Sequence, residues 1–346
     1  MLKAVPRVVR LAVACLIASG CASSAVRFPN ATPATPKEVP AELYTPSGIG
    51  PFPAVVLLHG CHGVSASTRQ WARWFKERGY VALVVDSWAA RGIKEDCSPT
   101  SPDLPNTERF DDGVGALRFL QARGDVDRDH VGVIGWSNGG AYAMALVNGP
   151  SHERARQRGV VMPEPGYRAA VGLYPGGCSS LIGQLAVRPL LVLIGASDDW
   201  TAAGPCVQMA ESMRQRGADV SVVVYPGAFH YFDVEGQART FLSNVVKDER
   251  TGALGATVAY DAAADADAHR RVSEFFGYHL RRHLSIAPAR LEPQVASDGY
   301  AGQRLSMPPA RVDPRVASDG YAGQRLSIAP ARLEPQVASD GYAGQR

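Results

Sequence analysis

The sequence has no block of charge of one sign. The 346-residue chain carries a formal net charge of only +3, and its basic residues are scattered along it. Nucleic-acid-binding proteins concentrate positive charge in stripes or patches, so we expect no nucleic-acid partner. The sequence also has no C-x-x-C pair of the kind that binds zinc, and no nucleotide, flavin or metal motif. We therefore expect no cofactor and no metal.

The sequence also lacks an apolar run long enough for a comfortable membrane span. Residues 1–21 read MLKAVPRVVRLAVACLIASGC, in which Lys3, Arg7 and Arg10 precede a short apolar run. This is the form of a secretory signal. The final ASGC resembles a bacterial lipoprotein signal with Cys21 as the lipidated residue, and ordinary cleavage that releases a soluble protein is the alternative. We expect an exported protein, periplasmic or membrane-anchored, that meets a membrane only through a lipid anchor on Cys21.

Two segments of biased composition flank the central part of the chain. Residues 22–42 are rich in Ala, Thr and Pro, which is typical of a linker. Residues 284–346 consist of tandem repeats of 21 residues, and the first, LSIAPARLEPQVASDGYAGQR, returns unchanged at 326–346. The repeats have few large apolar residues and recurring Pro, so stacking them would bury no apolar face. We predict a disordered tail, with a weak surface-binding role as the alternative.

Residues 43–283 alternate apolar β-branched runs with helix-like segments. The apolar runs are residues 54–59, 81–86, 130–135, 169–174, 189–195 and 220–225. The helix-like segments between several of them are residues 68–79, 108–124 and 206–217. This alternation predicts an α/β domain with a mostly parallel central sheet and helices on both faces. Because active groups in such sheets lie beyond the carboxyl ends of the strands, the residues that follow each run are the candidates for a site.

The run that ends at residue 135 leads into Gly-Trp-Ser-Asn-Gly, a G-x-S-x-G sequence centred on Ser137. A strand is expected before it, and the helix-like segment GAYAMALVN follows it. This context is that of a nucleophile elbow, in which a sharp strand-to-helix turn lifts a serine hydroxyl clear of the sheet. The flanking glycines are needed because a side chain there would collide with neighbouring backbone. A tight turn with an incidental serine is the alternative interpretation.

A carboxylate and a histidine follow the later strands in the order that a serine nucleophile requires. Asp198 and Asp199 follow the run that ends at residue 195, and His230 follows the last run. The order Ser137, Asp198, His230 is the α/β-hydrolase order. We expect His230 to act as the general base and Asp198 to fix its tautomer. Asp199 is the rival for that role, or a helix N-cap.

The segment LLHGCHG after the first run predicts half of an oxyanion hole. Such a site needs two backbone N–H groups aimed at one point, and we expect them from Cys61 and from Asn138. His59 and His62 lie in the same segment; with no third ligand in view, we interpret them as loop-packing residues rather than a metal pair. The remaining histidines, which follow no strand, are expected on the surface or on helices: His130, His152, His269, His279 and His283.

Four cysteines lie beyond the N-terminal signal, and in an oxidising compartment they allow three pairings. Cys61 and Cys97 follow strands that should be neighbours. Cys178 follows the fourth run, and Cys206 lies just past the strand that leads to Asp198. We hypothesise the pairs 61–97 and 178–206, which would brace loops around the site. Free buried thiols are the alternative.

At these residues the chain resembles the dienelactone hydrolase family of the α/β-hydrolase superfamily, from about Pro53 to His283. The resemblance rests on GVIGWSNGG, LIGASDDWT and YPGAFHYFD, and on the segment from VVLLHGCHG to VVDSWAARG. Type members of the family use a cysteine nucleophile in G-x-C-x-G, where this chain has Ser137. They also have a glutamate in the loop after the first strand, where Gly60 stands here. The resemblance implies a substrate-carboxylate role for Arg91, for which a solvent-facing arginine is the alternative.

Two functions follow from these residues. The first is an exported serine hydrolase that cleaves a small ester or lactone through an acyl-enzyme, with Ser137, Asp198 and His230 as its triad. The second is a non-catalytic surface lipoprotein that uses the hydrolase fold as a binding scaffold. Three reactive groups, each at the end of its own predicted strand, favour the enzyme, because a binding scaffold does not need them. The identity of the substrate and the oligomeric state are left open.

Overall fold

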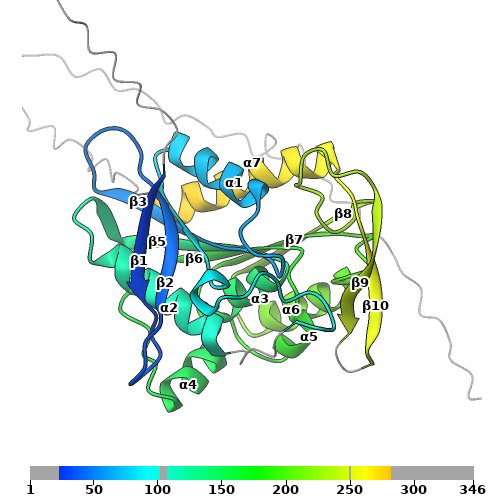
Figure 1. The fold of residues 1–346 in the computed structure, drawn as a ribbon, viewed down its shortest axis with the longest axis horizontal. Helices are drawn as coiled ribbons and strands as arrows, with labels where there is room; N and C mark the ends of the chain where they lie inside the picture. The colour runs from blue at the N-terminus through cyan, green and yellow to red at the C-terminus, as the bar shows by residue number, and fades with distance from the viewer. Residues whose placement is uncertain (1–22, 102–106, 249–250, 282–346) are drawn as a thin grey trace, which may run out of the picture. The chain divides into compact units, whose positions relative to one another are not determined.

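The computed structural model describes residues 23–101, 107–248 and 251–281 (Figure 1). The signal expected over residues 1–21 and the tandem repeats of residues 284–346 lie outside these residues, and so does His283. Within the described part, no helix is long and apolar enough to cross a membrane.

The central sheet has eight strands among the described residues, in the spatial order β1-β2-β4-β3-β5-β6-β7-β8. The strands are β1 (Ser24–Pro29), β2 (Glu38–Tyr44), β3 (Phe52–Leu58), β4 (Val81–Val85), β5 (Val126–Trp136), β6 (Ala169–Leu173), β7 (Leu190–Gly195) and β8 (Val220–Tyr225). Strands β3 to β8 pair in parallel, whereas β1 and β2 join antiparallel at one edge. The six predicted apolar runs therefore form the six parallel strands, and the prediction of a mostly parallel sheet is confirmed.

Helices cover both faces of the sheet, as Figure 1 shows. They are α1 (Ala66–Glu77), α2 (Thr107–Gln121), α3 (Asn138–Ala145), α4 (Gly149–Gln157), α5 (Cys178–Leu181), α6 (Ala203–Gln215) and α7 (Ala262–Leu280), with a short 3₁₀ turn at Ala89–Arg91. Helices α1 and α7 lie on one face, and α2, α3 and α6 on the other. Between them, β4, β6 and β7 are buried along their whole length, and β3 is buried from Ala54 onward.

Helix α7 was not among the predicted elements, and its sequence explains how it forms. The Asp261 carboxylate caps its first turn by accepting from the N–H groups of Ala263 and Ala264. Every fourth residue from Ala264 to Leu280 is buried, so one narrow stripe faces the sheet. Gly132 of β5 provides the room, because a Cβ there would lie 2.8 Å from the side chains of Phe276 and Leu280.

The prediction of a linker over residues 22–42 is wrong for the residues described, because β1 and most of β2 lie within it. Val39, Ala41 and Leu43 alternate with more exposed residues along β2 and are buried in the core. This is the period-two pattern of a half-buried strand. The Pro- and Thr-rich part between the strands forms their connection, where the Asn30 side chain accepts from the Lys37 N–H (2.9 Å). Its composition conceals the alternation on either side.

A separate two-stranded sheet was also not predicted. It pairs β9 (Thr240–Asp248) with β10 (Ala253–Val258) in antiparallel fashion. The hairpin packs beside the carboxyl ends of the central strands: Val245 and Ala256 share a small apolar cluster with Cys61 and Cys97. It therefore lies over the part of the fold where a site is expected.

Candidate active site

Ser137 occupies the sharp turn between β5 and α3, with a backbone φ of 52° and ψ of −115°. A positive φ is strained for a residue with a side chain, and such strain is frequent at functional sites. The neighbouring glycines are required by close contact. A Cβ on Gly135 would lie 2.2 Å from the Gly139 carbonyl oxygen, and one on Gly139 would lie 2.1 Å from that of Leu58. The strand–turn–helix geometry predicted from the sequence is confirmed.

His230 and Asp198 meet at the same edge of the sheet. The His230 Nδ1 lies 2.8 Å from Asp198 Oδ2, and neither side chain is exposed to solvent. The other carboxylate oxygen accepts from the N–H groups of Trp200 (2.9 Å) and Thr201 (2.8 Å). Burial alone would raise the pKa of Asp198, but His230 and these donors outweigh it and hold the pKa below its usual value. The carboxylate is thus suited to fix the tautomer and orientation of the ring.

Asp199, the rival of Asp198, contacts a different part of the fold. Its carboxylate accepts from the Thr257 N–H (2.7 Å) and from the Thr257 hydroxyl (3.2 Å). It therefore fastens β10 to the loop after β7. The structure brings Asp198, and not Asp199, to His230.

The other ring nitrogen of His230 is not used by the described part of the protein. Its Nε2 is buried and has no hydrogen-bond partner among the described residues. Gly176 lies between Ser137 and Thr201: its N–H donates to the Ser137 carbonyl (3.0 Å), and a Cβ there would lie 3.9 Å from Thr201 Cγ2. The Thr201 hydroxyl in turn lies 3.2 Å from His230 Nδ1. The serine turn, the acid loop and the histidine loop therefore converge.

The two expected oxyanion amides flank the serine. The loop after β3 passes over it, because a Cβ on Gly60 would lie 3.7 Å from Ser137 Cβ. Cys61 follows Gly60, and Asn138 begins α3. Among the described turns and loops, neither the Cys61 N–H nor the Asn138 N–H donates to a backbone carbonyl. A helix N-terminus carries such unsatisfied N–H groups and favours negative charge.

Arg109 is a site-supporting residue that sequence reasoning missed. It is buried on α2 and donates to the His59 carbonyl (2.7 Å) and to the Asn138 side-chain oxygen. It therefore joins the loop after β3 to the first residue of α3. Burial lowers the pKa of Arg109 to about 10, so the guanidinium stays charged at neutral pH. Its only signal in the sequence is a charged residue among the buried positions of a helix, which does not reveal its partners.

The two histidines of the loop after β3 have different surroundings. His59 is fully buried, and its Nε2 accepts from the Ser87 N–H (3.2 Å), so its interpretation as a packing residue is confirmed. The exposed His62 reaches across to the histidine loop, with Nδ1 2.7 Å from the Tyr231 hydroxyl. His62 and the sulfurs of Cys61 and Cys97 lie within 4.8 Å of one another, but the two sulfurs are bonded together and offer no thiolate to a metal.

Both hypothesised disulfides are confirmed: Cys61–Cys97 and Cys178–Cys206. The first links the loop after β3 to the loop after β4. The Cys97 carbonyl also accepts from the Val246 N–H (2.7 Å), which holds the β9–β10 hairpin. The second links α5 to α6. Each disulfide therefore braces one side of the candidate site.

Arg91 fits neither of its expected roles. Its side chain is only 3% exposed and not solvent-facing, and its guanidinium pairs with Asp112 (2.8 Å) and Glu108. A further N–H donates to the Ser87 carbonyl (2.6 Å). With its donors used inside the protein, it is not placed to bind a substrate carboxylate.

The other described histidines lie on helices or on β5. His152, His269 and His279 are on helices, as expected. His130 instead lies within β5, where its ring contacts the Asp127 carboxylate (3.0 Å).

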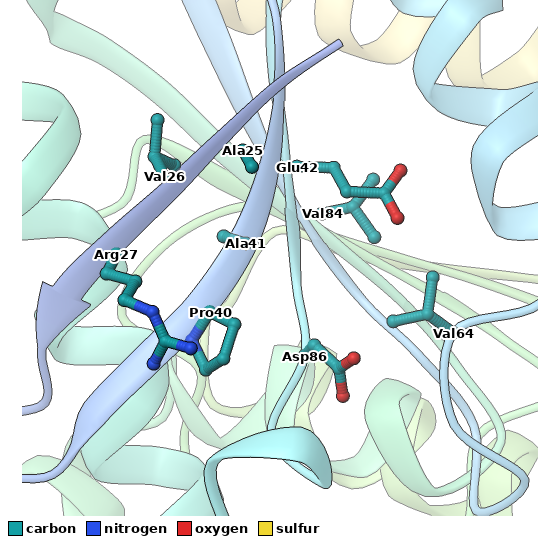
Figure 2. A pocket seen from close by; sticks show the side chains of 9 residues that line it. All are labelled: Ala25, Val26, Arg27, Pro40, Ala41, Glu42, Val64, Val84 and Asp86. Carbon is teal, nitrogen blue, oxygen red and sulfur yellow. The ribbon is translucent and has the colours of Figure 1, made fainter.

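A cavity of about 510 Å³ lies at the β1–β2 edge of the sheet (Figure 2). Arg27, Glu42 and Asp86 provide its polar lining, and Val64 comes from the loop that also carries Cys61. The Glu42 carboxylate is already paired with Arg69 (2.7 Å). Ser137, Asp198 and His230 do not line this cavity, so it is not the candidate active site.

Comparison with known proteins agrees with this geometry. A family model described as the dienelactone hydrolase family matches residues 39–280. A protein of Bradyrhizobium sp. named "Probable 2-oxo-3-(5-oxofuran-2-ylidene)propanoate lactonase" is 24% identical over 217 residues, which are 56% of this chain and 78% of that protein. Esterase EstD of Thermotoga maritima is 33% identical over 132 residues, which are 37% of this chain and 30% of the esterase.

Solved structures show the same fold. The dienelactone hydrolase-like promiscuous phosphotriesterase P91 from metagenomic libraries aligns with a TM-score of 0.54 at 21% identity, covering 75% of this chain and 100% of that chain. The apo form of Thermogutta terrifontis esterase 2 aligns with a TM-score of 0.53 at 17% identity, covering 75% and 96%. Likeness at this identity concerns the fold alone, whereas the family model spans most of the chain. The chain is a hydrolase that belongs to the dienelactone hydrolase family.

Proposed function

We propose that the protein is a serine hydrolase that cleaves a small ester or lactone through an acyl-enzyme. The observation that carries the proposal is the buried pair of His230 and Asp198, 2.8 Å apart, with His230 Nε2 left without a partner in the described chain. A neutral imidazole oriented by a carboxylate has a free nitrogen that takes up a proton. The strained Ser137 supplies the hydroxyl at the same edge of the sheet.

The reaction proceeds in two halves. His230 Nε2 removes the Ser137 hydroxyl proton as Oγ attacks the substrate carbonyl, and Asp198 stabilises the resulting imidazolium. The N–H groups of Cys61 and Asn138 bind the oxyanion. The imidazolium then gives its proton to the departing alkoxide. The alcohol is released, and the acyl group stays on Ser137 as an acyl-enzyme. A water molecule, deprotonated by His230, attacks this ester and frees the acid and the serine.

The proposed substrate class comes from the family and from the names of relatives. The Bradyrhizobium protein is named as a lactonase and the Thermotoga protein as an esterase. Esters and lactones share the acyl carbon that such a serine attacks, and a lactone differs only in that its leaving alcohol stays tethered to the acyl group. The acyl chain and the alcohol are therefore variables for the assay.

The test is p-nitrophenyl acetate hydrolysis together with labelling by a fluorophosphonate, which reacts with activated serines. We expect turnover and labelling for the wild type, neither for Ser137→Ala, and both for Ser179→Ala. Ser179 is a suitable control because it is an exposed serine on α5. A folded wild type that neither turns over nor becomes labelled would favour the binding scaffold over the enzyme.

We further propose that the enzyme works after export. The two disulfides support this, because such bonds persist in oxidising compartments. Fatty-acid labelling and fractionation of producing cells test the anchor. Label on the wild type but not on Cys21→Ser indicates a lipoprotein, label-free protein in the periplasm indicates ordinary cleavage, and cytoplasmic protein contradicts export.

A further inference from the structure

A second carboxylate lies buried near His230 with only neutral partners. Asp233 is 4% exposed, and three side chains donate to it. Trp71 (2.9 Å) and Trp136 (2.7 Å) donate their indole N–H groups to Oδ2, and the Tyr174 hydroxyl donates to Oδ1 (2.7 Å). Because an indole N–H only donates, Oδ2 acts as an acceptor for both tryptophans. Asp233 plays no part in the proposed reaction itself.

An arrangement of this kind is costly to bury. A carboxylate without a cation loses its hydration and gains only hydrogen bonds in return. Burial raises the pKa of Asp233, and the three donors oppose the rise. An apolar side chain would fill the same space without this cost. The polar cluster therefore calls for an explanation other than packing.

Two of the three donors lie directly beside the proposed catalytic groups. Trp136 immediately precedes Ser137 on β5. Tyr174 follows β6, and its ring centroid lies 4.4 Å from that of His230. Asp233 itself is three residues after His230. The third donor, Trp71, comes from α1 on one face of the sheet, and its ring packs against that of Trp136, with centroids 5.9 Å apart.

Backbone strain gathers at the same place. Among the described residues, positive φ angles at non-glycine positions occur at Ala34, Ser137, Tyr174 and Tyr231. Three of these four belong to the segments that Asp233 connects: Ser137 follows Trp136, Tyr174 is itself a donor, and Tyr231 follows His230. Strained conformations persist only where the surroundings determine them strongly. The hydrogen bonds to the buried Asp233 carboxylate hold the three strained segments in place.

We propose that Asp233 is a positioning residue that fixes the spacing between Ser137 and His230 by holding Trp136 and Tyr174 on one carboxylate. This inference rests on the proposed function. One oxygen holds the residue before the nucleophile, and the other holds the ring packed against the base. A small displacement of either group lowers the rate of reaction more than it weakens substrate binding.

The tryptophans offer a matched pair of variants, because both donate to the same oxygen. Trp136→Phe and Tyr174→Phe each remove one hydrogen bond on the catalytic side. We expect each to lower kcat by about tenfold or more while KM changes little. Trp71→Phe removes a hydrogen bond to Oδ2 from α1 but keeps an aromatic ring against Trp136, so we expect a lower Tm and a smaller loss of kcat than in Trp136→Phe. Circular dichroism confirms that each variant is folded.

Substitution of the carboxylate itself completes the test. In Asp233→Asn the amide oxygen still accepts from both indoles while the amide N–H₂ donates to Tyr174. We therefore expect Asp233→Asn to retain much more of the wild-type kcat than Asp233→Ala, with Tm measured for each. The inference is overturned if Trp71→Phe and Trp136→Phe lower kcat equally, or if folded Trp136→Phe and Tyr174→Phe retain full kcat. Activity that survives Ser137→Ala would instead overturn the proposed function.

Discussion

The two loops that flank the candidate site are held in place by different means. In the loop after β7, the Asp198 carboxylate is oriented by local groups: it accepts from the N–H groups of Trp200 and Thr201, two and three positions further along. The loop after β3 is held by residues distant in sequence, which are Trp88, Cys97 and Arg109, at separations of 27, 36 and 50 positions. The Asp198 side chain is thus oriented by local hydrogen bonds, although contacts such as that of Asp199 with Thr257 also fasten its loop, whereas the loop after β3 is held mainly by the tertiary fold.

The difference matters because the loops supply different kinds of group. The acid loop offers a charged side chain, and its short-range hydrogen bonds aim that charge at His230. The loop after β3 offers a backbone N–H. The direction of this N–H is set by the conformation of the loop and cannot be adjusted by rotating a side chain. An oxyanion hole depends on such fixed donors. Distant braces are therefore expected to control the rate on that side of the site.

The largest expected effect tests the role of Asp198 in the loop after β7. Asp198→Asn replaces the acceptor of the His230 Nδ1–H by an amide that also stabilises the wrong tautomer. We expect kcat to fall by about 10³- to 10⁴-fold. Asp199→Asn is the matched control, because its carboxylate contacts Thr257 and not His230. Steady-state kinetics on both variants measures the contrast, and a larger loss in Asp199→Asn would reverse the two assignments.

The central sheet was accessible from the sequence because its signal is local. Each apolar run from residues 54–59 to 220–225 formed a strand, and those of β4, β6 and β7 are buried along their whole length. The edge strands were missed because Pro and Thr around Asn30 dominate the composition there, although Val39 and its alternate neighbours are buried. The β9–β10 hairpin pairs outside the sheet and carries no comparable run.

The residues of the candidate site also differ in whether local sequence predicts them. Ser137, Asp198 and His230 could be selected from sequence because each follows its own strand, and parallel strands bring their ends together. Arg109 and Asp233 could not, because their roles depend on which helices and loops pack against them. Their partners are 50 positions away for His59 and 97 for Trp136. No local pattern encodes such a contact.

The next effect tests whether contacts with residues distant in sequence fix the position of the loop after β3. The two disulfides close segments of similar length, with separations of 36 and 28 residues. Removing either should therefore lower the free energy of unfolding by a similar amount, about 4 kcal/mol. Only Cys61→Ser with Cys97→Ser loosens the oxyanion loop, so we expect it to lower kcat by about tenfold as well. Cys178→Ser with Cys206→Ser leaves the loop after β3 braced, so it should lower kcat less.

Urea denaturation and steady-state kinetics on the two double variants separate these effects. Serine at position 61 keeps the backbone N–H, so a loss of rate reports the position of the loop and not the loss of a donor. Equal kcat values in the two double variants, at equal loss of stability, would mean that Arg109 and Trp88 suffice to hold the loop.

The smallest expected effect is a pH dependence that arises from His59. Burial and the nearby Arg109 hold the pKa of His59 well below its usual value. His59 Nε2 accepts a hydrogen bond from the Ser87 N–H, and a proton on Nε2 would replace this bond by a contact between two donors. The unfolded chain takes up that proton near pH 6.5, so the unfolded state binds more protons below this pH. The free energy of unfolding should therefore fall as pH is lowered, by at most about 1.4 kcal/mol per pH unit.

Denaturation of His59→Gln and His62→Gln at pH values from 7 to 5.5 isolates this contribution. Glutamine does not titrate, and at position 59 its side-chain oxygen can still accept from the Ser87 N–H. We expect His59→Gln to be less stable at pH 7 but to show a flatter pH dependence. The pKa of His62 is also lowered by burial, but this side chain is more exposed, so His62→Gln should flatten the slope less. Identical slopes in the wild type and His59→Gln would show that the acid sensitivity of the oxyanion loop arises elsewhere.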